Sequence, residues 1–184
     1  MHELSNPSIT SHFRTFALTH SRTPLTRANQ LVRELNLQPH PEGGYYREIH
    51  RSTLGVHPDD GRPVRSALTL IYFLLDASGH SRWHRVASDE TWQYVEGAAL
   101  ELFRIDPALQ EMERMRIGGL ADAAHPVRVI PAYHWQAARS TGAYTLVSCA
   151  VGPGFDFADF AMLADHPREA GLVRRHFPDA APLV

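Results

Sequence analysis

The spacing of hydrophobic positions differs between segments of the chain, and these differences separate predicted helices from predicted strands. In TPLTRANQLVREL, residues 23–35, apolar positions recur every three or four residues, which predicts a short amphipathic helix. Thr23 is a suitable N-cap, and Pro24 suits the first helical position. A second helix is predicted in HPREAGLVRRHF, residues 166–177, where Pro167 opens it.

Between these helices the apolar positions alternate with polar ones or form short runs, which predicts β-strands separated by turn residues. The expected strands are YYREIHRS (45–52), SALTLIYFLLD (66–76), RWHRVA (82–87), TWQYVEG (91–97), ALELFRI (99–105), MERMRI (112–117), VRVIP (127–131), HWQAAR (134–139) and AYTLVSCAV (143–151). This many short strands without βαβ alternation predict an all-β sandwich or barrel with a helix at each end.

Length and composition narrow the class of protein. The 184 residues suit one domain, and we expect a flexible extension over residues 1–23 followed by a single domain over residues 24–184. The net charge of −2 does not favour nucleic acid, and the longest apolar run, LIYFLL, is too short to span a membrane. Cys149 is the only cysteine and no signal-peptide pattern is present, which predicts a cytoplasmic protein with Cys149 buried in a strand.

Strand alternation brings the candidate chemistry together, because residues two apart on a strand share a face. The shared faces of three predicted strands carry His84 with Val86, Glu90 with Trp92 and Tyr94, and His134 with Gln136. If these faces line the barrel interior, an imidazole, a carboxylate and an amide lie among aromatic walls, as in many small-molecule sites. The candidate catalytic acid–base pair is then His84 and Glu90, and the candidate ligand-binding residues are Gln136, Trp92, Tyr94 and His134.

Each of these side chains also has a purely structural interpretation. A buried histidine can bond a backbone carbonyl, and the glutamate of ASDE can cap a turn. The aromatic residues can fill the core, His134 can be exposed beside a turn, and Gln136 can be a buried amide satisfied by backbone. The ordered pattern over three strands favours the site over these separate explanations.

Two further segments are open to more than one interpretation. HPEGGYYRE, residues 40–48, can form a turn and an edge strand with exposed charge, or it can line the barrel mouth. Its polar residues are Glu42, Tyr46, Arg47 and Glu48, of which Tyr46 and Arg47 are further candidate ligand-binding residues. GPGFDFADF, residues 152–160, is expected to pack a loop with alternating phenylalanines over the barrel.

Residues 79–97 resemble the first motif of the cupin superfamily, in which a glycine precedes His-x-His, a glutamate and a second glycine. The matching positions are Gly79, His84, Val86, Glu90 and Gly97, with one residue fewer than usual between the first two. The second motif, Pro-x-Gly-x-x-His, is matched by Pro131, but Tyr133 replaces the glycine and Gln136 replaces the histidine.

A closer resemblance is to the uncharacterised cupin-5 group, a domain of unknown function. The segments LNLQPHPEGGYYRE, IYFLL, WHRVASDETW, VIPAYHWQAA and VSCAVGPGFDFADFAML carry it, from about residue 35 to residue 163. The resemblance implies a double-stranded β-helix, or jelly roll, related in fold to the dTDP-sugar epimerases, and it implies a homodimer. It implies no particular reaction.

The resemblance raises the question of a metal, because cupin metal sites typically use three histidines and a glutamate. The equivalent positions here are His84, Val86, Glu90 and Gln136. Valine cannot ligate, and a neutral amide is a weak donor for transition metals, so we expect no metal cofactor. A divalent metal held by His84, Glu90 and Gln136 is the alternative.

Three functional hypotheses follow, none of which involves nucleic acid or a membrane. The preferred one is a cupin that binds a small polar, sugar-like metabolite and isomerises or epimerises it without metal. The chain has no match to the His–Asp dyad and tyrosine of the epimerase cupins, which weakens the epimerase form of this hypothesis. The second is a metal-dependent oxygenase or isomerase, and the third is a ligand sensor or storage-like dimer without enzymatic activity.

Overall fold

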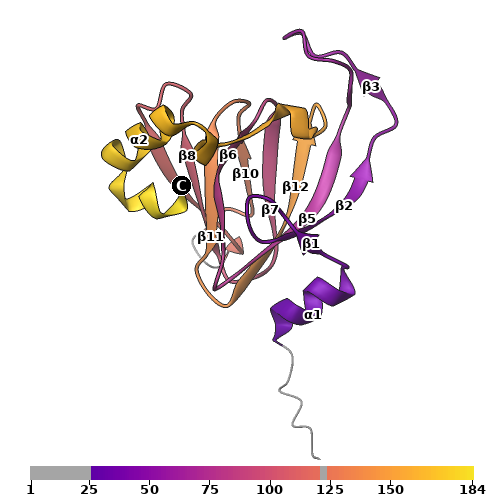
Figure 1. The fold of residues 1–184 in the computed structure, drawn as a ribbon. Coiled ribbons are helices and arrows are strands. Elements are labelled where there is room, and N and C mark those ends of the chain that lie inside the picture. The colour runs from indigo at the N-terminus through magenta and orange to yellow at the C-terminus, as the bar shows by residue number, and fades with distance from the viewer. Residues whose placement is uncertain (1–25, 121–123) are drawn as a thin grey trace, which may run out of the picture.

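The computed structural model describes residues 26–120 and 124–184, and the predicted extension over residues 1–23 lies outside them. Two β-sheets face each other as a jelly-roll-like sandwich, with helix α2 (Pro167–His176) beside one sheet and helix α1 (Arg27–Glu34) near the lower end of the other (Figure 1). The predicted all-β fold with a helix at each end is confirmed. No helix in the described ranges is long and apolar enough to cross a membrane.

The strands form two main sheets and one small ribbon, and every pairing in them is antiparallel. The six-stranded sheet has the order β1 (Gln38–Pro39), β2 (Tyr45–Arg51), β5 (Thr69–Asp76), β12 (Tyr144–Gly152), β7 (Asp89–Gly97) and β10 (Val127–Ile130). The five-stranded sheet has the order β13 (Phe160–Met162), β6 (His80–Val86), β11 (Trp135–Ser140), β8 (Leu100–Ile105) and β9 (Met112–Ile117). The ribbon pairs β3 (Gly55–Val56) with β4 (Arg65–Ser66). All nine predicted strands are present, and the four short strands β1, β3, β4 and β13 are additional.

Helix α1 begins later than the sequence pattern predicts. Its N-cap is Thr26, whose side-chain oxygen accepts a hydrogen bond from the backbone N–H of Asn29 at 3.2 Å. The predicted cap, Thr23, lies outside the described residues. Thr26 can replace it because either threonine supplies the same acceptor to the first turn. The apolar face of the helix packs on the outside of the six-stranded sheet in a cluster of Ala28, Leu31, Leu37, Leu74 and Leu146.

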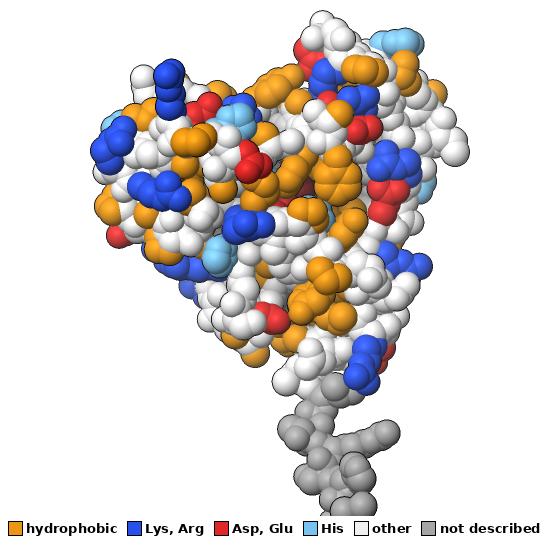
Figure 2. Space-filling view, in the orientation of Figure 1, with side chains coloured by type: hydrophobic (Ala, Val, Ile, Leu, Met, Phe, Trp, Pro, Cys, Tyr) orange, Lys and Arg blue, Asp and Glu red, His pale blue; other side chains and the backbone are white. Residues whose placement is uncertain are grey.

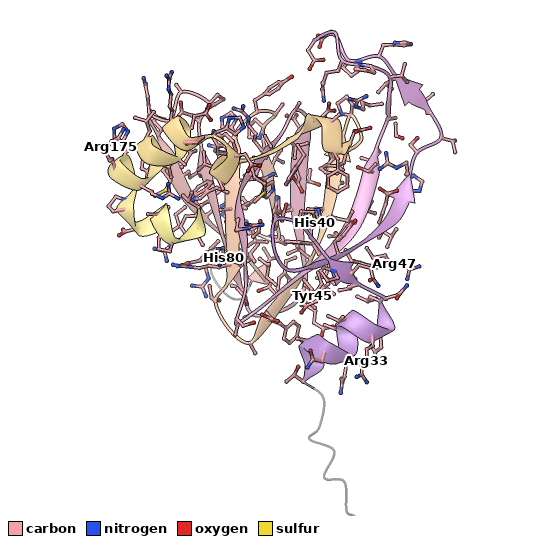
Figure 3. The ribbon with its side chains drawn as sticks, viewed as in Figure 1. Arg33, His40, Tyr45, Arg47, His80 and Arg175 are labelled. Carbon is pink, nitrogen blue, oxygen red and sulfur yellow. The ribbon has the colours of Figure 1, made fainter. Side chains whose placement is uncertain are left out.

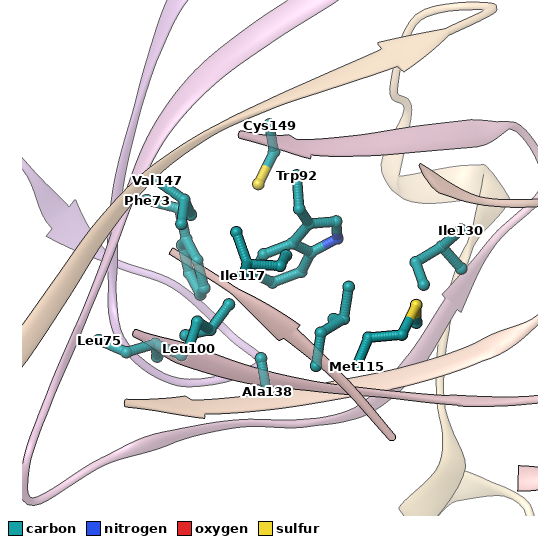
Figure 4. Close-up of a cluster of buried hydrophobic side chains, with 11 residues drawn as sticks. Phe73, Leu75, Trp92, Leu100, Met115, Ile117, Ile130, Ala138, Val147 and Cys149 are labelled. Atoms are coloured by element: carbon teal, nitrogen blue, oxygen red, sulfur yellow. The ribbon is translucent and has the colours of Figure 1, made fainter. Parts of the chain in front are cut away.

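The interior of the sandwich is filled at one end by apolar side chains (Figure 4). The cluster contains Phe73, Leu75, Trp92, Leu100, Leu102, Met115, Ile117, Ile130, Ala138, Val147 and Cys149. Cys149 is 1% exposed, as predicted. Burial of each large apolar side chain contributes roughly 1.5–3 kcal/mol, so this cluster is the core of the sandwich.

The C-terminal segment covers the outer face of the five-stranded sheet. Helix α2 begins at Pro167, as predicted, and the short helices η3 (Leu163–Asp165) and η4 (Pro178–Leu183) flank it. The C-terminal segment and the outer face of the sheet form a second apolar cluster. Trp83 and Trp135 belong to this cluster and are fully buried. Since their strand neighbours His84 and Gln136 are buried as well, β6 and β11 are covered on both faces, and the lumen-facing residues lie in a dry environment.

Candidate functional site

The other end of the lumen is a cavity of about 310 Å³ between the two sheets. Its opening is visible as a hollow rimmed mainly by hydrophobic side chains (Figure 2). The buried polar residues of its lining are His40, Glu42, Thr69, His84 and Glu90. The aromatic residues are Tyr46, Phe73, Trp92, Phe155, Phe157 and Phe160, and the more exposed charged residues include Glu48 and Arg51. The cavity thus combines apolar walls with a few convergent polar groups, which is the usual composition of a small-molecule site.

His84 on β6 faces a carboxylate from the loop between β1 and β2. Its Nε2 lies 3.2 Å from Oε2 of Glu42, and its Nδ1 lies 2.8 Å from the backbone carbonyl oxygen of Arg82. Because that carbonyl can only accept, Nδ1 carries a hydrogen, and Nε2 faces Glu42. The other oxygen of Glu42 accepts a hydrogen bond from the Ser81 hydroxyl at 2.8 Å.

Burial sets the protonation of this pair. Glu42 is 6% exposed and His84 is 2% exposed. Loss of water raises the pKa of Glu42 to about 8, although the Ser81 hydrogen bond acts in the opposite direction. Loss of water lowers the pKa of His84. Both shifts favour the uncharged pair at neutral pH, in which the Glu42 carboxyl group donates its hydrogen to Nε2 of His84.

Glu90 on β7 is held by a second chain of hydrogen bonds. Nε2 of Gln136 donates to Oε2 of Glu90 at 2.6 Å, and Nε1 of Trp92 donates to Oε1 of Gln136 at 2.9 Å. Since an indole N–H can only donate, it fixes which way the Gln136 amide points. Burial raises the pKa of Glu90 to about 7, so this carboxyl group is partly ionised at neutral pH.

His40 completes the buried polar lining. Its Nδ1 accepts a hydrogen bond from the backbone N–H of Glu42 at 3.3 Å, and burial, with the neighbouring His84, lowers its pKa to about 4. The ring packs edge-on against Tyr46, with centroids 4.6 Å apart. No residue in the described ranges bonds its Nε2, although the side chain is only 7% exposed. His40 is therefore neutral at pH 7 and keeps one ring nitrogen for a ligand.

Comparison with known families accounts for this architecture. A family model described as Cupin superfamily (DUF985) matches residues 29–163. The chain belongs to the cupin superfamily. The resemblance carried by the sequence motifs is thereby confirmed, and a comparison with curated proteins gave no match.

Solved structures place this cupin beside proteins of the same fold. A hypothetical protein from Leishmania major is 31% identical, with a TM-score of 0.72 over 84% of this chain and 94% of that chain. A protein from Shewanella oneidensis is 28% identical, with a TM-score of 0.72 over 87% of this chain and 96% of that chain. An oxalate decarboxylase from Lactobacillus farciminis is 15% identical, with a TM-score of 0.51 over 79% of this chain and 39% of that chain, and it shows the fold alone.

The structure brings some of the residues singled out in the sequence to the cavity of this cupin and places others elsewhere. The residues that line the cavity or bond directly to its lining are His84, Glu90, Gln136, Trp92 and Tyr46. Arg47 follows Tyr46 on the strand, points to the outside (Figure 3) and donates to the carbonyl oxygen of Leu35 at 3.1 Å. Tyr94 lies deeper, where its hydroxyl donates to the carbonyl oxygen of Gly97. The Nδ1 of His134 lies 3.2 Å from the Ala132 carbonyl oxygen in the turn before β11.

Glu42 and His40 are two buried polar cavity residues that the sequence pattern did not single out as catalytic or binding residues. Both belong to HPEGG, a loop without periodicity, and periodicity was the signal used to assign faces. A turn signal was present, because proline fixes its own φ and the two glycines that follow Glu42 allow positive φ. In the structure Gly43 and Gly44 both have positive φ, and the turn brings Glu42 beside His84.

The donor set of the cavity does not fit a typical cupin metal site. No group of three or more His, Cys, Asp or Glu side chains in the described ranges is arranged to hold a metal ion. Gln136 turns its NH₂ group toward Glu90, while its carbonyl oxygen is already bonded to Trp92. An amide in this orientation turns its N–H donors, and not its oxygen, toward Glu90, which does not suit a metal shared by the two side chains. The chemistry proposed below therefore uses no metal.

We expect a metal titration to have little effect. Protein purified without a tag or chelator should contain less than about a tenth of an equivalent of Fe, Mn, Ni or Zn, because a divalent ion would have to break the Glu90–Gln136–Trp92 chain. Elemental analysis and thermal unfolding with added metal measure this. Stoichiometric metal, or a large rise in the unfolding temperature on reconstitution, would show that the site rearranges to bind it.

Trp92→Phe should destabilise the protein more than Trp135→Phe. Both indoles are buried, but Nε1 of Trp92 donates to Gln136, whereas Nε1 of Trp135 has no partner in the described part of the chain. Loss of the Trp92 donor leaves the Gln136 carbonyl unpaired, which costs ~1–3 kcal/mol beyond the loss of volume common to both variants. Urea unfolding of the two variants measures the difference, and equal losses would contradict the role assigned to this hydrogen bond.

Proposed function

We propose that this cupin binds a small polar, sugar-like metabolite in the cavity and moves a proton on it without metal, as an isomerase or epimerase does. The observation that carries the proposal is the meeting of two proton-transfer groups in one buried cavity: the Glu42–His84 pair and Glu90. Their pKa values lie near neutrality because both are buried, and a general acid or base is most effective when its pKa is near the working pH.

The two groups suit different halves of a proton transfer. Glu90 is the more acidic carboxyl group, so its ionised form is the base that takes a proton from a carbon next to a carbonyl group. The electron pair of the broken C–H bond forms the C=C bond of an enol, while the π electrons of the carbonyl group take a proton from the carboxyl group of the Glu42–His84 pair. For epimerisation, a proton from water adds to the other face of the same carbon, Glu90 releases its proton to water, and the enol O–H returns its proton to Glu42 as the carbonyl group re-forms. For isomerisation, Glu90 returns its proton to the former carbonyl carbon, and the hydroxyl group on the neighbouring carbon gives its proton to Glu42 as the new carbonyl group forms.

The hydrogen bonds around Glu90 support its role as the base. Gln136 holds one oxygen of the carboxylate, and Trp92 prevents the amide from turning over. The second oxygen is therefore kept in a defined direction, with the Cys149 side chain as its neighbour. Burial raises the pKa of Cys149 well above its usual range, so this residue stays a neutral thiol and does not compete as a base.

Deuterium uptake tests the proposal. Protein in D₂O is incubated with a panel of sugars and sugar derivatives, and incorporation of deuterium at carbon is followed by NMR. Wild-type protein should label at least one compound, and His84→Ala and Glu90→Gln should each reduce the rate by ~10²–10⁴-fold. Binding and labelling that are unchanged in His84→Ala would refute the proposed chemistry.

We also propose that the chain forms a homodimer. Three valine side chains of β7 and the edge strand β10, Val95, Val127 and Val129, are each 46–47% exposed. An unprotected edge with apolar side chains favours association with another chain. Light scattering should give twice the chain mass of 20.6 kDa, and a mass of one chain would contradict the proposal.

A further inference from the structure

Part of the cavity wall is a cluster of aromatic rings. Phe155, Phe157 and Phe160 form one group with ring centroids 5.0–6.1 Å apart. The ring of His40 contacts this group at 6.1 and 6.3 Å, and on its other side it packs against Tyr46. The faces of aromatic rings attract cations, because their π electrons carry partial negative charge.

The charged groups of the lining are mainly acidic. The cavity is lined by four carboxyl groups, Glu42, Glu48, Glu90 and Asp156, and by one guanidinium group, that of Arg51. Burial raises the pKa values of Glu42 and Glu90 to about 8 and about 7, and a cation beside these carboxyl groups would stabilise their ionised forms. The lining therefore favours a positive charge in the ligand over a negative one.

The guanidinium of Arg51 is largely taken up by protein acceptors. Its Nε and Nη2 donate to the two oxygens of Glu48 at 2.9 and 2.7 Å. Its Nη1 donates to the backbone carbonyl oxygen of Phe155 at 3.1 Å. All three nitrogens have protein acceptors, and the charge of Arg51 is offset by Glu48. Arg47 and Arg85 do not line the cavity.

We propose that the ligand of the cavity is a small polar molecule with a protonated amino group, of the class of amino alcohols and amino sugars. The proposal rests on the cavity being the binding site of the proposed function, and it adds the charge of the ligand. The amino group would lie against the aromatic wall and the carboxyl groups. The unpartnered nitrogen of His40, in a side chain 7% exposed, would bond an oxygen of the same molecule.

Matched compounds that differ only in charge test the proposal. One series is glucosamine, glucose and glucuronate, and a smaller one is ethanolamine, ethylene glycol and glycolate. Titration calorimetry at pH 7, with tryptophan fluorescence as a second signal, gives the affinity of each. The amine of at least one series should bind at least about tenfold more tightly than its neutral and anionic counterparts.

Two variants locate the effect. Glu90→Gln keeps the shape of the side chain and should weaken amine binding about tenfold, with a smaller effect on the neutral compound. Glu48→Gln changes a residue that is 38% exposed, so it should leave the fold intact; it frees Arg51 and should weaken the amine relative to the anion. The control is Glu113→Gln on β9, where the side chain is 50% exposed and pairs with Arg104, away from the cavity; it should change no affinity.

The outcomes separate this inference from the proposed function. It is overturned if, in both series, a neutral or anionic compound binds as tightly as the amine, or if neither amine binds at any soluble concentration. It is also overturned if Glu113→Gln weakens the amine as much as Glu90→Gln and Glu48→Gln do. If an uncharged sugar binds and exchanges deuterium in a manner that depends on His84, the charge assignment fails while the proposed function stands. If amines bind but no compound is labelled with deuterium, the charge assignment stands and the proposed function fails.

Discussion

Replacing Glu42 and Glu90 together by glutamine should make the protein more stable at pH 8 than the wild type. Each carboxyl group has a folded-state pKa, about 8 and about 7, above its usual value of 4.5. The folded state therefore holds protons that the unfolded state has released, and wild-type stability falls as the pH rises through these values. Between pH 6.5 and 8 the loss should be roughly 2 kcal/mol, and the double variant should not show it.

Glutamine preserves the contacts at both positions. At position 42 its carbonyl oxygen can accept from Ser81 while its NH₂ group donates to Nε2 of His84, and at position 90 its carbonyl oxygen can accept from Gln136. Urea unfolding at several pH values from 6.5 to 9 measures the effect. Glu113→Gln, on the exposed face of β9, is the control for loss of one negative charge. A wild-type stability that does not change over this range would contradict the assigned protonation states.

The histidines act on the other side of neutrality. Burial lowers the pKa of His40 to about 4 and also lowers that of His84. Their neutral forms stabilise the fold above the unfolded pKa of 6.5, and that stability is lost as the pH falls toward 4. The change between pH 6.5 and 8 thus comes mainly from the two carboxyl groups, because most of the effect of the histidines lies below pH 6.5. Burial of two carboxyl groups with raised pKa values reduces the stability of the protein at the alkaline end of this range.

The fold was predictable because strand periodicity and turn residues are local properties. The alternation in RWHRVA and TWQYVEG was enough to put His84, Glu90 and Trp92 on inward faces, and Gln136 lies opposite His84 in the register of β11 and β6. What alternation could not supply was the depth of each residue in the lumen. Tyr94 shares its face with Glu90 and Trp92 but lies in the filled end, where a bulge shifts the register of β12 against β7.

The carboxyl partner of His84 was not predictable by the same means. Glu42 reaches the cavity from a loop whose path depends on contacts made far along the chain: its backbone carbonyl oxygen accepts from the N–H of Arg82 at 2.8 Å, and its side chain accepts from Ser81. Arg47 illustrates the opposite case, since strand alternation alone would have placed it outside once Tyr46 was placed inside. The direction of a loop side chain depends on tertiary contacts that the sequence pattern does not contain. The direction of a strand side chain follows from alternation once the direction of one neighbour on the strand is known.

Gly43→Ala should cost at least about 3 kcal/mol of stability, because a left-handed backbone and a backbone clash coincide at this position. Gly43 has φ +114°, and a Cβ added there would lie 2.2 Å from the backbone carbonyl oxygen of His80. Neither atom can move without shifting β6. The same close approach holds Glu42 opposite His84, so the variant should also lose ligand binding. Urea unfolding and calorimetric titration measure the two effects.

Gly61→Ala is the control that separates the cost of the steric clash from the cost of the left-handed backbone conformation. Gly61 has φ +83°, but an added Cβ would meet no atom within 4 Å. Its substitution should therefore cost only the left-handed conformation, about 1–2 kcal/mol, and leave binding unchanged. If the two variants lose the same stability, the contact between the loop and β6 is not what fixes Gly43. If Gly43→Ala folds and binds normally, then Glu42 does not depend on this turn for its place beside His84, and the acid–base pair must be held by the side-chain bonds alone.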